Sequence, residues 1–324
     1  MTRLTNANLS KKNKPSLSKG FIKEILKNKT FYLMMLPGIL YILLVYYAPM
    51  FGIVIAFKDY NPIQGILGSK WVGFKNFEFF FKSQSALTVT FNTLFYNTIF
   101  IIGGLGLAVF AAMMLNEIKN KFLSSVYKSI IFFPYLISWV VGSYLLFSLL
   151  SVDRGLVNHI FQFFGKEPVQ WYMEASHWRF IIPLAYMWKN VGYLSIIFLA
   201  AITGISTEYY EAAEIDGATN FQKMIKITLP LIAPVVITMF LLQAGKIFFG
   251  GLGDWGIFYN LPRESGMLFS TTDVIDTYVF RSLRQMNDAG MTAAVGLYQS
   301  VVGFVLVLVA NFLVKKYDPD SALF

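Results

Sequence analysis

Long apolar stretches alternate with shorter polar segments along the chain beyond residue 30. Most of these stretches hold about 20 residues or more, the length that a helix needs to cross the hydrocarbon core of a membrane. A transmembrane β-barrel would instead show short segments of alternating hydrophobicity. The pattern therefore predicts an all-α, polytopic membrane protein with about six transmembrane helices. The predicted spans are residues 31–57, 93–115, 130–150, 181–203, 231–245 and 292–314.

Composition supports a membrane protein. Of the 324 residues, 56% are hydrophobic and only 14% are charged, whereas about a quarter of a soluble domain is charged. The absence of cysteine excludes disulfides, thiolate metal sites and cysteine nucleophiles, and two histidines are too few for a histidine-rich metal site. We expect neither a metal nor a cofactor on this chain. The net charge of +9 is explained by basic segments beside the spans rather than by nucleic acid binding.

The distribution of basic residues predicts the orientation. Residues 1–30 carry eight Lys or Arg and one acid, and we expect them to form a basic cytoplasmic tail with a short amphipathic helix. Basic residues are nearly twice as dense in the termini and the loops on their side as in the other loops, which places both termini in the cytoplasm. The predicted domains are this tail, a transmembrane domain at 31–316 and a cytoplasmic tail at 317–324.

A polar insert at 204–230 separates the fourth and fifth spans. Its first half is rich in helix formers, and Gly217 then interrupts the helix because glycine tolerates positive φ. Thr219 followed by Gln222 predicts a capping box and a second short helix. Pro230 is expected to reset the backbone before the next span. The local prediction is a helix, a turn and a helix at a membrane surface.

This insert resembles the EAA loop of permease subunits in ABC importers. In that family the loop reads Glu-Ala-Ala, three residues, Gly, nine residues, Ile, one residue and Leu-Pro. The fixed positions are filled here by Glu211, Ala212, Ala213, Gly217, Ile227, Leu229 and Pro230. The family's loop is a coupling helix that docks into a cleft of a separate ATPase subunit. The alternative is an ordinary cytoplasmic helical loop.

The resemblance implies roles for individual residues of the loop. Glu211 would pair with an arginine of the ATPase, and the two alanines would allow close packing in its cleft. Gly217 would permit the turn between the two short helices. We therefore predict Glu211, Ala212, Ala213, Asp216 and Gly217 as the residues that couple this chain to an ATPase.

Other patches resemble the sugar-uptake permeases typified by the first membrane subunit of the maltose importer. The resemblance is greatest to the subgroup that serves large oligosaccharides and polysaccharides, including the alginate importer. It implies a type I ABC importer fold in a bacterial cytoplasmic membrane. The maltose subunit has extra N-terminal spans and a large outer domain that this chain lacks, so its substrate site is not transferred. The patches are residues 36–38, 56–60, 71–77, 272–281 and 294–297.

The resemblance also implies partners. They are a second homologous permease, a dimer of ATPase subunits, an extracytoplasmic solute-binding protein and a saccharide substrate. The chain has no phosphate-binding motif of the form G-x-x-x-x-G-K-[ST]. We therefore expect the partner ATPase to use the ATP and Mg²⁺, and we expect this chain not to be an enzyme.

Polar and aromatic residues inside the spans predict a substrate pathway, because such residues usually face a cavity or a partner. Aromatic rings would cover sugar faces, and amides or cations would bind hydroxyls and carboxylates. The alternative is that they form interhelical hydrogen bonds or snorkel to the interface. Tyr298, Gln299 and Asn311 in the last span are weaker candidates. The predicted pathway residues are Trp188, Lys189, Asn190, Tyr193, Gln243 and Lys246.

Lys189 suggests the charge of the substrate. An unpaired ammonium at mid-span costs about 3 kcal/mol, and the predicted core spans contain no Asp or Glu. A carboxylate on the substrate would offset this cost, which favours a uronate-type oligosaccharide. The alternative is a salt bridge to a loop or to another subunit.

Other functions remain open at this stage. A secondary transporter driven by an ion gradient would need intramembrane acids or broken-helix ion sites. An intramembrane enzyme would need convergent acid, base or metal-binding residues, and we find none in the sequence. An ABC permease for a neutral sugar, an amino acid, phosphate or a peptide is also compatible with the loop. The segment 246–291 would contact a binding protein or form a solvated face.

Overall fold

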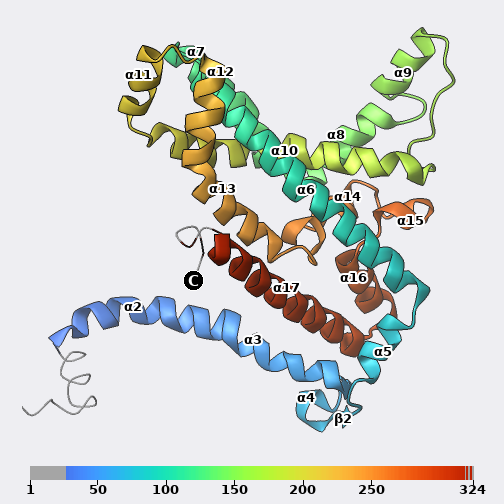
Figure 1. Cartoon of the computed structure of the whole chain (residues 1–324). Coiled ribbons are helices and arrows are strands. Elements are labelled where there is room, and N and C mark those ends of the chain that lie inside the picture. Colours follow the sequence, from blue (N-terminus) through green and yellow to red (C-terminus); the bar gives the residue numbers. More distant parts are fainter. Residues whose placement is uncertain (1–26, 318, 320–321, 323–324) are drawn as a thin grey trace, which may run out of the picture. The chain divides into compact units, whose positions relative to one another are not determined.

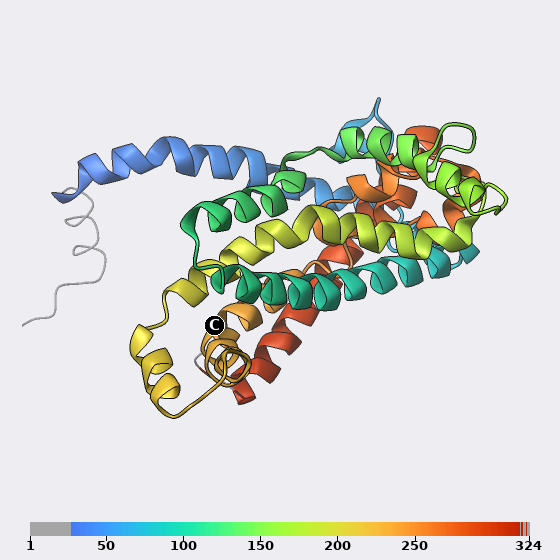
Figure 2. The same ribbon diagram turned by 90° about the horizontal axis from the view of Figure 1, so that it is seen from above.

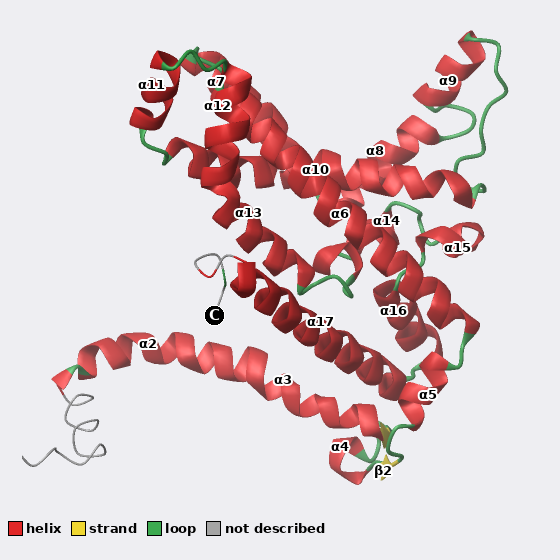
Figure 3. Ribbon diagram, viewed as in Figure 1, coloured by secondary structure: helices red, strands yellow, loops and turns green. Residues whose placement is uncertain are grey.

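The computed structural model describes residues 27–317, 319 and 322. The predicted amphipathic helix before residue 27 and most of the C-terminal tail lie outside the described residues. The chain forms two compact units, one ending at Val54 and one running from Ile55. Helices dominate both units, and a short ribbon pairs β1 (Lys58–Asp59) with β2 (Lys70–Trp71) in antiparallel register (Figure 3).

In the part of the first unit that the structure describes, the chain forms one long apolar helix. It contains α2 (Lys29–Ile42), a π turn (Leu43–Tyr47) and α3 (Ala48–Met50), and it continues as a 3-10 helix to Phe57 in the second unit. The whole segment is long and apolar enough to cross a membrane, which confirms the first predicted span. The π turn ends two residues before Pro49. A wider turn accommodates a proline ring that would clash with the carbonyl four residues earlier in a regular helix.

The helices of the second unit are shown in Figure 1. The longer ones are α5 (Lys75–Phe81), α6 (Gln84–Asn116), α7 (Lys121–Phe132), α8 (Trp139–Leu150), α9 (Leu156–Phe163), α10 (Ala175–Thr203), α11 (Thr207–Ile215), α13 (Leu229–Ala244), α16 (Ile275–Met286) and α17 (Ala289–Tyr317). The short ones are α4 (Gly65–Gly68), α12 (Asn220–Lys223), α14 (Gly256–Asn260) and α15 (Phe269–Thr272).

The core of the second unit forms around α6 and α10, which pack against each other. The two helices cross in the view of Figure 1 and run alongside each other in the view of Figure 2. Large side chains from both helices are fully buried, among them Tyr96, Phe100 and Trp178. The rings of Phe100 and Tyr186 stack with their centroids 3.8 Å apart. These contacts make the pair the rigid part of the bundle, against which the other spans pack.

The third predicted span is not one straight helix, and this part of the prediction is wrong. The polypeptide enters as α7 from Lys121, bends by 100° and leaves as α8. Pro134 lies in the 3-10 turn before the bend, and Ile137 is extended. Ser138 then caps α8 by accepting a hydrogen bond from the Val141 N–H. Proline removes one helical hydrogen bond, and the serine starts a new helix in its place.

The polar insert folds largely as predicted. Gly217 has φ 77° after α11, and Thr219 and Gln222 form the capping box. One expectation is wrong, because Pro230 does not mark a break in the helix before the fifth span. Instead α12 runs through a π turn (Met224–Thr228) into α13, so that Asn220–Ala244 is one candidate span. The π turn shifts the pattern of main-chain hydrogen bonds just before Pro230, which has no N–H to donate.

Candidate functional site

One face of α11 is exposed, and residues on its other face contact the start of the helix that follows the insert. The Tyr210 hydroxyl lies 2.9 Å from Thr228 Oγ1, and Lys223 Nζ lies 3.7 Å from a carboxylate oxygen of Glu214. These contacts tie α11 to the start of the span that follows. They join the two sides of the turn at Gly217.

The opposite face of α11 is free within the described chain. Helical spacing places Glu208, Glu211, Ala212 and Ile215 on this outward face, and all four are exposed. Ile215 is 88% exposed, and Glu211 forms no ion pair or hydrogen bond with any residue that the structure describes. Asp216 and Gly217 close the face at its C-terminal end. Acidic groups around an exposed apolar side chain are suited to docking against a basic, partly apolar cleft.

A pocket of about 380 Å³ lies between the middle of α10 and the end of α13. It brings together four of the six predicted pathway residues, namely Asn190, Tyr193, Gln243 and Lys246. We call it the pathway pocket. Its other polar or aromatic lining residues are Tyr135, Tyr186 and Asp254.

The walls of the pathway pocket offer both flat apolar surfaces and polar groups. The rings of Tyr135 and Tyr193 stack with centroids 4.4 Å apart. The Asn190 side chain donates to the Tyr186 carbonyl oxygen, and the Gln243 Oε1 atom is buried without a hydrogen-bond partner. Such a mixture of aromatic faces and hydrogen-bonding groups is typical of sites that bind sugars.

Trp188 and Lys189 do not line the pathway pocket. Consecutive residues of a helix point in different directions, so Trp188, Lys189 and Asn190 on α10 face three different sides. Trp188 instead borders an apolar pocket of about 550 Å³, together with Ile181 and Leu184. These three positions are one or two helical turns apart, whereas Asn190 points elsewhere. Tyr186 lies one turn before Asn190, and this spacing could have identified it from the sequence.

Lys189 has partners that the sequence analysis did not anticipate. It is 8% exposed, and its Nζ donates to the main-chain carbonyls of Tyr135, at 3.3 Å, and of Ile137, at 2.5 Å. Its ammonium also lies 5.0 Å from the centre of the Trp139 ring. These carbonyls are left open where α7 ends at the bend, and a cation suits the C-terminal end of a helix. Lys189 therefore stabilises the broken span, and a carboxylate is not needed to balance its charge.

We expect Lys189→Met to destabilise the permease by about 1–3 kcal/mol, because the carbonyls at the bend lose their donor. The measurement is the apparent Tm of the purified protein in detergent. Lys128→Met on α7 is the matched control, since Lys128 is partly exposed and has no partner among the described side chains. An equal Tm for the two variants would contradict the structural role of Lys189.

Side chains from α6, α16 and α17 form hydrogen bonds with the loop 245–254, part of which lines the pathway pocket. The Asn97 amide donates to the carbonyls of Ile247 and Phe249 and accepts from the Leu252 N–H. Asp276 accepts from the Gly250 N–H at 2.6 Å, and burial raises the pKa of its carboxyl. Gln299, a weaker pathway candidate, instead donates to the Phe248 carbonyl. Buried polar contacts with other helices thus fix the loop in addition to its own 3-10 turn at Gly250–Gly253.

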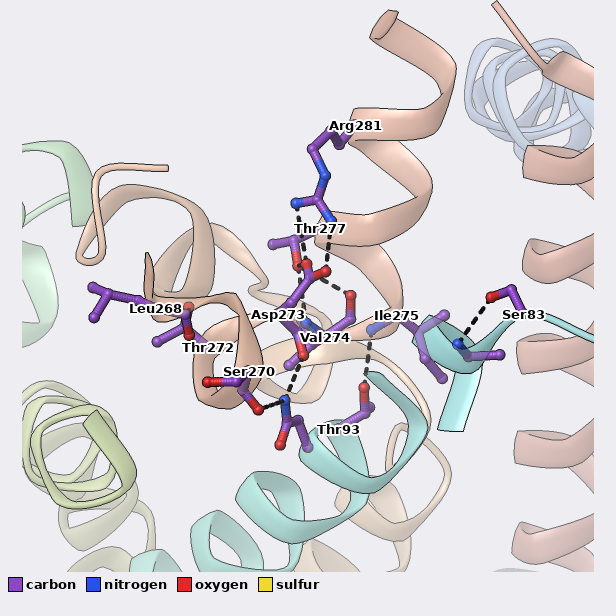
Figure 4. A network of polar contacts seen from close by, with 12 residues as sticks. Ser83, Thr93, Leu268, Ser270, Thr272, Asp273, Val274, Ile275, Thr277 and Arg281 are labelled. Carbon is purple, nitrogen blue, oxygen red and sulfur yellow. Dashed lines mark hydrogen bonds and ion pairs between the residues drawn. The ribbon is translucent and has the colours of Figure 1, made fainter. Parts of the chain in front are cut away.

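A second network fixes the segment between α15 and α16 (Figure 4). Arg281 forms an ion pair with Asp273, whose Oδ1 also accepts from the Thr277 hydroxyl. Asn92 and Thr93 on α6 bind the main chain of this segment. Much of the charge in the segment 246–291 is therefore used inside the protein. Arg263, Glu264 and Arg284 stay exposed and remain available to a partner.

A bundle of apolar helices, with a polar helical insert between two of them and a pocket lined by several polar side chains, has the architecture of a transport permease. Residues 104–319 match the family described as "Binding-protein-dependent transport system inner membrane component". The chain belongs to this family. This confirms the resemblance to ABC importer permeases and places the protein in the membrane as a transport subunit.

Two proteins of Bacillus subtilis (strain 168) are similar along nearly their whole length. The polygalacturonan/rhamnogalacturonan transport system permease protein YteP is 36% identical over 94% of this chain and 93% of its own. Protein LplB is 32% identical over 96% of this chain and 98% of its own. The comparison therefore covers the loop and both pockets.

A solved structure has the same fold. A chain of a bacterial ABC transporter involved in the import of the acidic polysaccharide alginate matches with a TM-score of 0.83 and 30% identity, over 92% of this chain and 99% of that chain. A second structure of the alginate transporter, in complex with an alginate pentasaccharide-bound periplasmic protein, matches with a TM-score of 0.82 and 30% identity, over 91% and 97%. These matches confirm the predicted fold class.

Proposed function

We propose that this chain is a permease subunit of an ATP-driven importer for acidic oligo- or polysaccharides. A solute-binding protein delivers the saccharide on the outer side. A second, homologous permease completes the pathway, and a dimer of ATPase subunits binds ATP and Mg²⁺. The relatives that transport polygalacturonan, rhamnogalacturonan and alginate support a substrate that carries carboxylates.

One observation carries the proposal. Two of the helices that line the pathway pocket, α10 and α13, are also the two spans on either side of the polar insert at 204–230. The π turn keeps the second of them continuous from Asn220 to Ala244. Closure of an ATPase dimer on α11 would therefore shift both walls together, and it would change access to the pocket between them. Such a movement would link ATP binding mechanically to a solute pathway.

The orientation follows from the same proposal. The insert at 204–230 lies in the cytoplasm, where it reaches the ATPase, and both termini lie on the same side. The density of basic residues supports this orientation. The exposed Arg263, Glu264 and Arg284 then face outward, where charged groups suit contact with the binding protein.

The test is uptake and ATP hydrolysis by the complete complex in proteoliposomes, with its binding protein and either oligogalacturonate, alginate oligosaccharide or a neutral maltooligosaccharide. We expect the acidic oligosaccharides to stimulate hydrolysis and to enter the vesicles. Stimulation by the neutral sugar alone would support the assignment as an ATP-driven importer and contradict the proposal of an acidic substrate. Uptake that needs no ATP and follows an ion gradient would contradict the assignment as an ATP-driven importer.

A further inference from the structure

We propose that Lys246 selects for the carboxylate of the sugar in the pathway pocket and that Gln243 accepts a hydroxyl hydrogen bond from the same sugar. This inference rests on the proposed function. It assigns the recognition of charge to the end of α13 rather than to Lys189 at mid-span.

The two lysines near the pocket differ in what surrounds their charges. The ammonium of Lys189 is buried and is satisfied by main-chain carbonyls and the Trp139 ring. Lys246 is exposed and lines the pocket, and its ammonium has no hydrogen-bond or ion-pair partner within the described chain. Only Lys246 is therefore free to bind an anion that enters the pocket.

The carboxylate of Asp254 also borders the pocket, but it is already engaged. Its Oδ2 accepts a hydrogen bond of 2.7 Å from the indole nitrogen of Trp139. No ion pair joins Asp254 to Lys246 in the described structure. The pocket thus contains one free cation and one anion that is held against α8. Such a site favours a single, correctly placed carboxylate rather than anions in general.

Gln243 provides a second, independent sign of a ligand. Its Oε1 atom is buried and lacks a donor, although buried polar groups are nearly always hydrogen-bonded. Gln243 lies one turn before Lys246, and the Lys246 N–H donates to its main-chain carbonyl at 2.9 Å. The two side chains therefore leave the same end of α13. A saccharide hydroxyl is a suitable donor for the amide oxygen.

The pocket therefore offers a partner for each part of an acidic sugar. The stacked rings of Tyr135 and Tyr193 border the space where an apolar sugar face would lie. Gln243 accepts from a hydroxyl, and Lys246 pairs with the carboxylate. A neutral sugar would use the first two groups and leave the ammonium unpaired.

The experiment compares an oligogalacturonate with its methyl ester, which lacks the negative charge and carries one additional methyl group on each carboxyl. Uptake is measured in proteoliposomes of the complete complex, at concentrations that saturate the same binding protein with each probe. The variants are Lys246→Gln and Lys246→Arg. Lys315→Gln at the end of α17 is the control for loss of a cation. Affinity of the binding protein for each probe is measured separately and is common to all variants.

We expect Lys246→Gln to lower the uptake rate of the acid about tenfold, the effect of losing one charge-assisted hydrogen bond. Uptake of the ester should not change, so the acid-to-ester ratio falls by the same factor. Lys246→Arg should keep most of the preference, and Lys315→Gln should keep all of it.

Four results would overturn the inference. An equal fall for both probes would give Lys246 a structural role, and no fall for either would remove it from the pathway. Loss of preference in Lys246→Arg, in a complex with unchanged Tm, would mean that a positive charge at this position is not what selects the acid. If the wild-type complex moves neither probe, the proposed acidic substrate itself is wrong, and the inference fails with it.

Discussion

Replacement of Glu211 by lysine is expected to abolish solute-stimulated ATP hydrolysis and uptake while the permease still folds. Glu211 is exposed on the outward face of α11 and has no partner in the described chain. Its replacement therefore breaks nothing within this subunit. If the carboxylate pairs with a cation in the ATPase cleft, reversing its charge places two cations together at a desolvated contact. Breaking such a pair costs about 2–5 kcal/mol, and we expect stimulated hydrolysis to fall at least about 100-fold.

The matched control is Glu117→Lys at the C-terminal end of α6. It makes the same change of charge at an exposed site, and a cation near a helix C-terminus is tolerated. Both variants are purified, and the measurements are the apparent Tm, co-purification of the ATPase and stimulated hydrolysis in proteoliposomes. Normal hydrolysis in Glu211→Lys, or a loss of equal size in Glu117→Lys, would contradict docking through the outward face of α11.

The geometry of the polar insert at 204–230 could be predicted from the sequence because it depends on neighbours in the chain. A glycine with positive φ and a Thr–Gln capping box act over a few residues. The continuity of α12 with α13 was missed for the opposite reason. Pro230 is a strong local breaker, but a π turn before it preserved the helix. Local rules name the residue that disturbs a helix and do not determine how the helix adapts.

The pathway pocket could be predicted only in part. Asn190, Tyr193, Gln243 and Lys246 are polar or aromatic residues within or beside apolar spans, and this signal found them. Hydropathy alone could not reveal that α7 and α8 meet at 100°, because residues on both sides of the bend are apolar. The main-chain carbonyls of Tyr135 and Ile137 at the bend accept hydrogen bonds from Lys189. The charge of Lys189 therefore no longer requires a substrate carboxylate. Partners of a buried cation are set by tertiary contacts.

Gly192→Ala is expected to destabilise the permease and to close or distort the pathway pocket. A methyl group at this position would overlap the carbonyl oxygen of Ile131 on α7. Main-chain atoms cannot rotate away, so α7 and α10 would have to separate. Overpacking costs about 1–3 kcal/mol when side chains can adjust, and we expect about 3 kcal/mol or more here. The measurements are the apparent Tm and the uptake rate, and both should fall.

The same separation would act on function through two contacts that lie next to Gly192. Lys189 would be drawn away from the carbonyls at the bend, and the stacking of Tyr193 on Tyr135 would open. Gly106→Ala on α6 is the control, because a methyl group there meets no atom within 4 Å and alanine favours a helix more than glycine does. We expect it to preserve both Tm and uptake. If Gly192→Ala behaved like this control, the close contact of α7 with α10 would not be what shapes the pocket.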